Sequence, residues 1–235
     1  MSICLFCHHH YIEKPSWSKI FSNNKSESIC QHCLSNLKKL EGNRCTKCSR
    51  ILLKEYSDVP ICYDCNRWEK NQLTQSLIVR NYSLYRYNSF LKEILATFKY
   101  RGDTIIASYF SQKLFDTYQA FFSNAYVICI PLSKERLHER GFNQAELLVE
   151  GWPNKEYVHL LMKNERSKQS KKSRRLRLQS FQDNPFFIEK QNIDLSLNNI
   201  VLVDDIYTTG TTIRQAAIVL KQAGANQIFS ITIAR

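Results

Sequence analysis

The sequence lacks any apolar run long enough to cross a membrane, and its longest apolar stretches, such as residues 126–132, have the length of one buried strand. Its first ten residues contain Cys and His in place of the charged and then apolar pattern of a signal peptide. Gly and Pro number only 6 and 5, and they form no long linker. These absences predict a cytoplasmic protein without a transmembrane segment.

Two widespread phosphate-binding motifs are missing as well. No Lys follows a Gly at the spacing of a Walker A loop, and no Gly-x-Gly-x-x-Gly of a dinucleotide site is present. The sequence therefore excludes these two kinds of phosphate site.

Residues 200–212 carry a different phosphate signature. They read Ile-Val-Leu-Val-Asp-Asp-Ile-Tyr-Thr-Thr-Gly-Thr-Thr, which is an apolar strand, two acids and a Thr-rich loop, and a helical pattern follows over residues 213–223. Backbone N–H groups at a helix N-terminus favour a phosphate, and Gly210 lets the backbone approach it closely. Asp204 and Asp205, at the end of the strand, can accept hydrogen bonds from sugar hydroxyls or hold hydrated Mg²⁺. This order predicts a ribose 5-phosphate site.

The same segment resembles the signature of type I phosphoribosyltransferases. In that family the paired acids hold the ribose hydroxyls of phosphoribosyl pyrophosphate (PRPP), which binds with Mg²⁺, and the loop binds its 5′-phosphate. The resemblance implies that Asp204 and Asp205 are the acid pair, with Asp204 assisting the oxocarbenium-like charge if the chain is a catalyst. It implies that the 5′-phosphate is bound by Thr208, Thr209, Gly210, Thr211 and Thr212. The alternative is a plain turn in which Thr209 or Thr212 only caps the helix.

A second candidate loop follows the apolar strand predicted at residues 126–130. In type I phosphoribosyltransferases the loop at this place holds the pyrophosphate of PRPP. The resemblance therefore implies that Ser133 and Lys134 bind pyrophosphate, with Lys134 as a point charge on phosphate oxygens. An ordinary turn at the end of the strand is an equally good interpretation.

Nine cysteines are present, and eight of them form four Cys-x-x-Cys pairs before residue 66. In a chain without a signal peptide such pairs predict zinc ligands. Eight thiolates make two closed Cys₄ sites, which indicates structural Zn²⁺ and not a catalytic metal. Sequential pairing makes two zinc ribbons in series, and a cross-braced arrangement is compatible with the same spacing. The eight predicted ligands are Cys4, Cys7, Cys30, Cys33, Cys45, Cys48, Cys62 and Cys65.

A domain boundary is expected near residue 70. Residues 1–70 show little apolar periodicity, so metal binding must contribute to their folding. Residues 71–235 alternate between strand and helix patterns, which predicts an α/β fold with a mostly parallel sheet and helices on both faces. Strands are expected at residues 79–87, 126–130, 157–162, 200–203 and 227–233, and helices at 88–98, 104–122, 143–150 and 212–223, with a loop up to residue 140.

Two further motifs, Lys99-Tyr-Arg-Gly-Asp and Arg140-Gly-Phe-Asn-Gln, lie between the Cys pairs and Asp-Asp-Ile-Tyr-Thr-Thr-Gly. The four motifs in this order resemble the ComF-type late-competence proteins over essentially the whole chain. The resemblance implies a double zinc ribbon followed by a type I phosphoribosyltransferase-like domain. It also implies a cytosolic role in the uptake of single-stranded DNA during natural transformation. Partners from the competence machinery would then bring the chain to the inner face of the membrane.

The formal net charge of +12 favours anionic partners. Lys and Arg concentrate in residues 163–177, where eight basic side chains are opposed only by Glu165. This segment is a solvated loop, a flap over the PRPP site or a nucleic-acid contact. Nearby, Phe181, Phe186 and Phe187 either stack on bases or belong to the core. We expect weak binding of single-stranded DNA.

Three functions are compatible with these patterns. A DNA-uptake component with a domain that binds PRPP or a related ribose phosphate is the leading hypothesis. A working phosphoribosyltransferase for a nucleobase or a purine precursor is the second. A module that senses PRPP without catalysis is the third.

Overall fold

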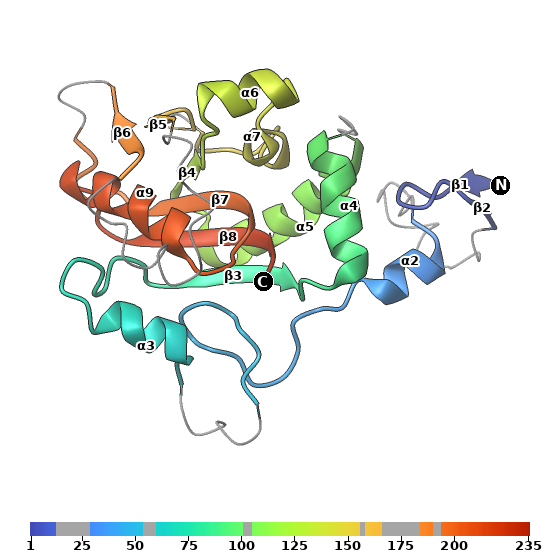
Figure 1. Cartoon of the computed structure of the whole chain (residues 1–235), viewed down its shortest axis with the longest axis horizontal. Coiled ribbons are helices and arrows are strands. Elements are labelled where there is room, and N and C mark those ends of the chain that lie inside the picture. The colour runs from blue at the N-terminus through green and yellow to red at the C-terminus, as the bar shows by residue number, and fades with distance from the viewer. Residues whose placement is uncertain (13–28, 54–59, 101–104, 156–157, 166–183, 190–193) are drawn as a thin grey trace.

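A four-stranded parallel sheet forms the centre of the fold (Figure 1). The computed structural model describes residues 1–12, 29–53, 60–100, 105–155, 158–165, 184–189 and 194–235. The strands lie in the order β3 (Asn81–Tyr85), β8 (Ile228–Ala234), β7 (Ile200–Ile206) and β4 (Tyr126–Cys129). Each neighbouring pair is parallel. The carboxyl ends of all four strands therefore meet at one edge, which is where open α/β sheets bind ligands.

Helices cover both faces of this sheet. They are α4 (Ser89–Tyr100), α5 (Ile105–Phe122) and α7 (Gln144–Leu148) on one face and α9 (Thr211–Gln222) on the other. Successive strand residues point to opposite faces. Val201 and Val203 of β7 accordingly pack with α4, α5 and α7, while Ile200 and Leu202 pack with α9. The predicted α/β fold, a mostly parallel sheet with helices on both faces, is confirmed.

The residues before β3 form short elements that pack on the sheet domain. β1 (Ser2–Ile3) pairs with β2 (His10–Tyr11), and α2 (Gln31–Asn36) and α3 (Tyr63–Glu69) follow. The ring of Phe6 stacks on that of Phe110 in α5, with centroids 5.8 Å apart. The hydroxyl of Ser49 donates to the backbone carbonyl of Asn81 in β3 at 2.6 Å. The boundary near residue 70 stays a prediction, but the amino-terminal residues share both hydrophobic cores with the sheet.

The loop predicted up to residue 140 is wrong, because Lys134–Arg140 form helix α6. None of the residues of α6 is buried, so no apolar period marks this helix in the sequence. Its end is set by Gly141, which has a φ of 77° and whose N–H donates to the carbonyl of Leu137.

Two strands also differ from the prediction. β7 continues through Ile206, so Asp204 and Asp205 are the last part of the strand and not the residues after it. The strand predicted at residues 157–162 begins later, as β5 (Leu161–Lys163). It pairs antiparallel with β6 (Phe186–Ile188), which the sequence pattern did not predict. Short strands at the rim of a fold carry too few residues for a clear alternation.

Candidate functional site

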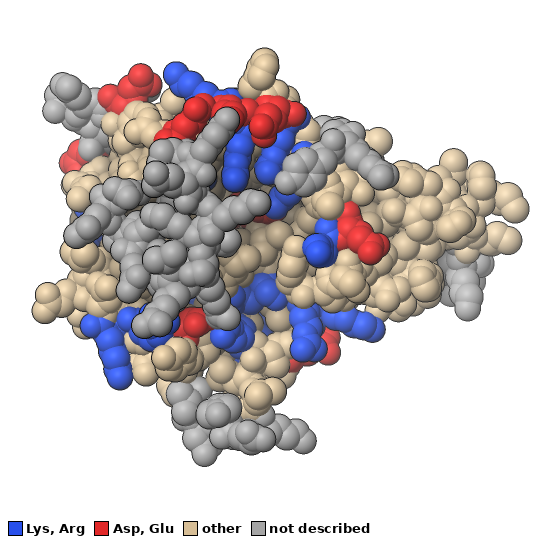
Figure 2. All heavy atoms as spheres, in the orientation of Figure 1, with Lys and Arg blue, Asp and Glu red and all other residues tan. Residues whose placement is uncertain are grey.

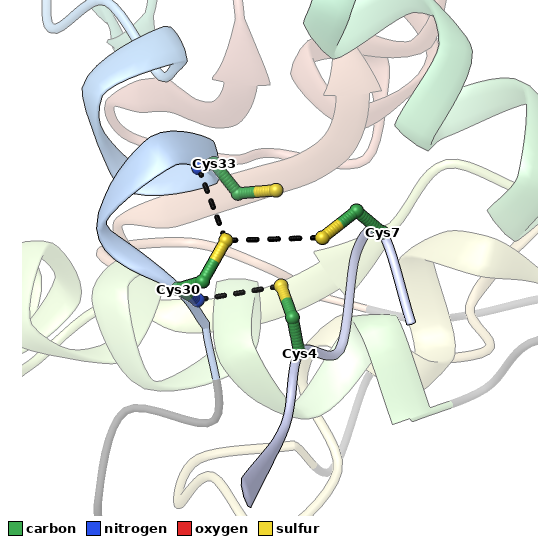
Figure 3. Close-up of side chains that lie close together, drawn as sticks. All are labelled: Cys4, Cys7, Cys30 and Cys33. Atoms are coloured by element: carbon green, nitrogen blue, oxygen red, sulfur yellow. Dashed lines mark hydrogen bonds between the residues drawn. The ribbon is translucent and has the colours of Figure 1, made fainter. Parts of the chain in front are cut away.

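The eight paired cysteines gather into two groups of four, and each group joins two pairs that are consecutive in the sequence. All four Sγ atoms of a group lie within 4.8 Å of one another. Figure 3 shows the first group, where the Sγ atoms of Cys7 and Cys30 are 3.8 Å apart. In the second group those of Cys48 and Cys62 are 3.6 Å apart. The first group is Cys4, Cys7, Cys30 and Cys33, and the second is Cys45, Cys48, Cys62 and Cys65.

These distances fit metal sites and not disulfides. A tetrahedral site with Zn–S bonds of about 2.3 Å has S···S separations of about 3.8 Å, whereas a disulfide has an S–S bond of about 2.0 Å. The backbone N–H of Cys62 donates to the Sγ of Cys45 at 3.2 Å, and that of Cys30 donates to the Sγ of Cys4 at 3.3 Å. Such hydrogen bonds favour thiolates. The groups therefore fit two closed Cys₄ sites with sequential pairing, and the cross-braced arrangement is excluded.

We expect the purified protein to contain two Zn²⁺ per chain, measured by elemental analysis. Each structural Zn²⁺ contributes on the order of 10 kcal/mol of apparent binding free energy, so both ions should survive dialysis without a chelator. Cys129→Ser is the control, because Cys129 is buried in β4 outside both groups and its loss should leave the zinc content unchanged. Zinc-free protein, or disulfides within the groups under reducing conditions, would contradict the prediction.

The two acids predicted to bind ribose stand together at the carboxyl end of β7. The backbone N–H of Asp205 donates to Oδ1 of Asp204 at 2.9 Å. The Nζ of Lys99, near the end of α4, forms an ion pair with the Asp205 carboxylate. Burial, and next the charge of Asp205, raises the pKa of Asp204 to about 8. The ligand-free pair thus combines a carboxylate paired with Lys99 and a carboxyl group whose pKa is raised; bound Mg²⁺ or positive charge on the sugar would lower that pKa and favour the ionised form.

Replacing Asp204 with Asn should stabilise the protein at high pH. The Asp204 pKa is about 8 in the folded chain against an ordinary 3.8, so the wild-type carboxyl group costs stability progressively as pH rises from 3.8 to about 8. The Asn side chain cannot ionise. The increase in the free energy of unfolding of Asp204→Asn over wild type should be near zero at pH 4. Above pH 8 it should be at least about 1 kcal/mol, or about 2 to 4 °C in Tm. Thermal unfolding at both pH values checks this, with Asp116→Asn on the exposed side of α5 as control; equal gains at both pH values would contradict it.

The loop after β7 leaves backbone N–H groups open at the N-terminus of α9. Gly210 is the N-cap residue, with a φ of 79°, and it has no side chain with which to cap the helix. The hydroxyls of Thr209 and Thr211 are 2.9 Å apart. Within the described part of the chain, the N–H groups of Thr208, Thr209 and Gly210 have no hydrogen-bond partner. Thr208 is exposed, and Thr212 lies half-buried in the first turn. The N–H of Thr211 donates to the hydroxyl of Thr209 at 3.4 Å, a contact that the capping interpretation also expects, so the phosphate role of the loop stays a prediction.

Ser133 and Lys134 lie at the carboxyl end of β4, beside β7. Ser133 is the buried N-cap residue of α6, and Lys134 is the exposed first residue of that helix. Because Cys129 of β4 pairs with Val203 of β7, this turn and the acid pair are at the same edge of the sheet. No hydrogen bond links the turn to the loop after β7 in the described part of the chain. A cavity of about 410 Å³ opens beside Lys134 and is bounded by residues of the antiparallel strands β5 and β6.

Most of the basic stretch at residues 163–177, from residue 166 on, lies outside the described residues, as does Phe181. The Nζ of Lys163 lies 5.0 Å from the ring centroid of Phe186, which is buried and is thus a core residue. Phe187 is half-buried and lines the cavity beside Lys134. Figure 2 shows further Lys and Arg side chains both above and below the centre of the face that it draws.

Three residues to which the sequence analysis assigned no role in the site contact the acid pair or the loop. Lys99 pairs with Asp205, and its only signal is its place in Lys-Tyr-Arg-Gly-Asp. The Nε1–H of Trp68 donates to the carbonyl of Thr209 at 2.9 Å, across 141 residues of sequence. The guanidinium of Arg235 donates to the backbone carbonyl of Tyr207 at 3.1 Å. No local pattern in the sequence could have indicated the contacts of Trp68 and Arg235.

Comparison with known proteins decides the family. The chain is 37% identical over 237 residues to the competence protein ComFC of Bacillus subtilis (strain 168), with 99% of this chain aligned to 95% of that protein. It is 32% identical over 218 residues to the competence protein ComFC of Streptococcus pneumoniae (strain ATCC BAA-255 / R6), covering 93% of this chain and 92% of the relative. The chain belongs to the ComF family of competence proteins. No protein-family model matches it.

A more distant member of the ComF family, competence protein F of Haemophilus influenzae, is 24% identical over 226 residues. The resemblance predicted from the four sequence motifs is therefore confirmed. Among the helices that the structure describes, none has the length and apolar character needed to traverse a bilayer.

Proposed function

We propose that this ComF-family chain is a cytoplasmic component of DNA uptake in natural transformation, and that its sheet edge binds PRPP or a related ribose phosphate. Its relatives in Bacillus subtilis and Streptococcus pneumoniae are named as competence proteins. Partners from the competence machinery bring the chain to the inner face of the membrane. Bound Mg²⁺ would neutralise the pyrophosphate charge of PRPP.

The observation that carries the proposal is the combination of the acid pair with open N–H groups in one short segment. Asp204 and Asp205 lie near the end of β7, and the N–H groups of the following loop, at the start of α9, have no hydrogen-bond partner among the residues that the structure describes. Carboxyl groups accept from ribose hydroxyls, and N–H groups at a helix N-terminus donate to phosphate. A ligand that carries a hydroxyl pair and a phosphate a few ångströms apart satisfies both. The hydroxyls of Thr208, Thr211 and Thr212 add donors for the phosphate.

The cavity beside Lys134 favours an active phosphoribosyltransferase as the second function. Its volume of about 410 Å³ falls in the range of small-molecule pockets. It lies at the same sheet edge as the acid pair, next to the turn that would hold pyrophosphate. His159 and Phe187 are among the residues that line it. A nucleobase or purine precursor bound there could accept the ribose phosphate as pyrophosphate leaves, with Asp204 assisting the positive charge on the sugar.

Single-stranded DNA is the proposed macromolecular ligand. The net charge of +12 supplies the attraction to phosphates, and it makes the affinity depend on salt. A cavity of about 340 Å³ next to Thr208 is lined by Arg50, Arg86 and Arg235. Basic side chains therefore also lie beside the loop of residues 207–211, which we call the phosphate loop. The binding should be weak and tolerant of sequence, because these contacts are to the backbone of the nucleic acid.

Calorimetric titration with PRPP and Mg²⁺, with and without single-stranded DNA, tests the proposed function. We expect one saturable, Mg²⁺-dependent site per chain, for which ribose 5-phosphate competes. Screening nucleobases for pyrophosphate release then separates the hypotheses: release with one base identifies a transferase, and binding without release identifies a PRPP-sensing module. DNA affinity should fall as salt is raised. Absence of PRPP binding at any Mg²⁺ concentration would refute the ribose-phosphate site.

A further inference from the structure

The carbonyl oxygens of the phosphate loop are held by side chains from distant parts of the sequence. The guanidinium of Arg235 donates to the carbonyl of Tyr207 at 3.1 Å and also to that of Thr208. The Nε1–H of Trp68 donates to the carbonyl of Thr209 at 2.9 Å. Three consecutive carbonyl groups of the loop thus have side-chain donors.

Holding these carbonyl groups also sets the direction of the N–H groups. In a trans peptide the C=O of one residue and the N–H of the next point in opposite directions, and the described chain contains no cis peptide. Donors on the carbonyls of residues 207, 208 and 209 therefore turn the N–H groups of Thr208, Thr209 and Gly210 away from those donors. These are the N–H groups that the proposed function assigns to a phosphate.

The two donors, Trp68 and Arg235, both lie next to the second cysteine group. Trp68 lies in α3, the helix that carries Cys65, and is 3% exposed. The Nη2 of Arg235 donates to the Sγ of Cys48 at 3.2 Å. In addition, the guanidinium of Arg214 in α9 lies 4.8 Å from the ring centroid of Trp68. Trp68 is thus packed from the α9 side as well, and its indole N–H is fixed in place.

The first cysteine group packs elsewhere. Cys4 and Phe6 belong to the core on the opposite face of the sheet, with α4 and α5. No hydrogen bond joins this group to residues 207–211 in the part of the chain that the structure describes. The contact with the phosphate loop is therefore specific to the second group.

We infer that the second cysteine group is the structural support of the phosphate loop. Trp68 and Arg235 are positioning residues that orient the N–H groups of the loop toward the ligand. The inference rests on the proposed ribose-phosphate role of the loop. A metal-bound Cys₄ group would serve this purpose well, because it fixes α3 rigidly and its thiolates give Arg235 an anionic acceptor. The amino-terminal module then contributes to binding as well as to folding.

Trp68→Phe tests the inference, since Phe keeps an aromatic ring beside Arg214 but removes the N–H donor to Thr209 together with part of the ring volume, a loss of volume that Trp152→Phe reproduces. Arg235→Lys is the second variant, which keeps the charge but has one terminal nitrogen in place of two, so it cannot bond both the loop carbonyls, which Nη1 contacts, and the Sγ of Cys48, which Nη2 contacts. Trp152→Phe is the matched control: Trp152 is also buried, and its Nε1–H donates to Ser111 at 3.2 Å, far from the loop. Three quantities are measured on each protein: zinc content, PRPP affinity, and NMR order parameters of the N–H groups at residues 208–210.

We expect Trp68→Phe and Arg235→Lys to retain two zinc ions and to lose PRPP affinity by about fivefold to tenfold, the effect of one hydrogen bond. The order parameters should fall from about 0.85, typical of rigid backbone, toward about 0.6. Trp152→Phe should leave the PRPP affinity and the order parameters unchanged. Wild-type order parameters in both loop variants, or an equal fall in Trp152→Phe, would overturn the inference. If the wild type binds no PRPP, the proposed function fails, while the order parameters still decide the inference.

Discussion

Gly210→Ala should abolish ribose-phosphate binding, with an affinity loss of more than about a hundredfold. Gly210 has a φ of 79°, a conformation that is strained for Ala, and an added Cβ would lie 2.5 Å from Cζ of Tyr207 and overlap the guanidinium of Arg214. Neither neighbour can move easily, because both are almost fully buried and are joined by a hydrogen bond of 2.6 Å. The loop must therefore shift, and the N–H groups that it presents to phosphate shift with it.

The stability of the Gly210→Ala protein should also fall, since overpacking of this kind costs about 1 to 3 kcal/mol. Gly151→Ala is the matched control. Gly151 has a φ of 81°, but no atom lies within 4 Å of a Cβ built on it, so that variant reports the backbone strain without the clash. Calorimetry and thermal unfolding of both variants check the prediction. PRPP affinity in Gly210→Ala within about threefold of wild type would mean that the loop does not bind the phosphate.

The double replacement Asp204→Asn with Asp205→Asn should reduce Mg²⁺-dependent PRPP affinity by more than about a hundredfold. Hydrogen bonds to charged groups contribute about 1.5 to 3 kcal/mol each, and two of them are lost. The fold should persist, because Asn has the shape of Asp and the change at position 204 removes a group whose pKa burial raises to about 8. The change at position 205 removes the ion pair with Lys99, which offsets part of that gain.

The control for the acid pair is Lys99→Met, which removes the ion pair and leaves both acids in place. If Lys99 only positions Asp205, Lys99→Met should weaken PRPP binding less than the double replacement does. Circular dichroism and a cooperative thermal transition establish that each variant is folded. A folded double variant with unchanged PRPP affinity would show that the acids do not contact the ribose.

The sequence by itself determined the features that are local along the chain. A Cys-x-x-Cys pair spans one tight turn, so its ligand character does not depend on the rest of the fold, and the eight cysteines do form two groups of four. The order of strand, acids, loop and helix in residues 200–212 is equally local, and the structure contains β7 and α9 there. The succession of strand-length and helical patterns was sufficient to predict the parallel sheet, because strands that are buried on both faces read as continuous apolar runs.

The same patterns could not predict elements that are exposed or short. Helix α6 has no buried residue, and its cap residues, Ser133 and Gly141, were its local signs. Sequential pairing of the cysteines could not be separated from cross-bracing, since both use the same turns. The raised pKa of Asp204 depends on burial and on the charge of Asp205 in the folded state, and burial is a property of the packed chain.

Only the tertiary structure decided how the amino-terminal cysteines relate to the phosphate loop. The strand order β3-β8-β7-β4 brings Trp68 to Thr209 and Arg235 to Cys48, which are 141 and 187 residues apart in sequence. Hydrogen bonds over such separations leave no periodicity and no spacing, because the chain between the partners can vary without changing the contact. The sequence could thus predict a metal module and a phosphate loop separately. Their junction arises because the sheet brings the carboxyl end of β7 next to the second cysteine group.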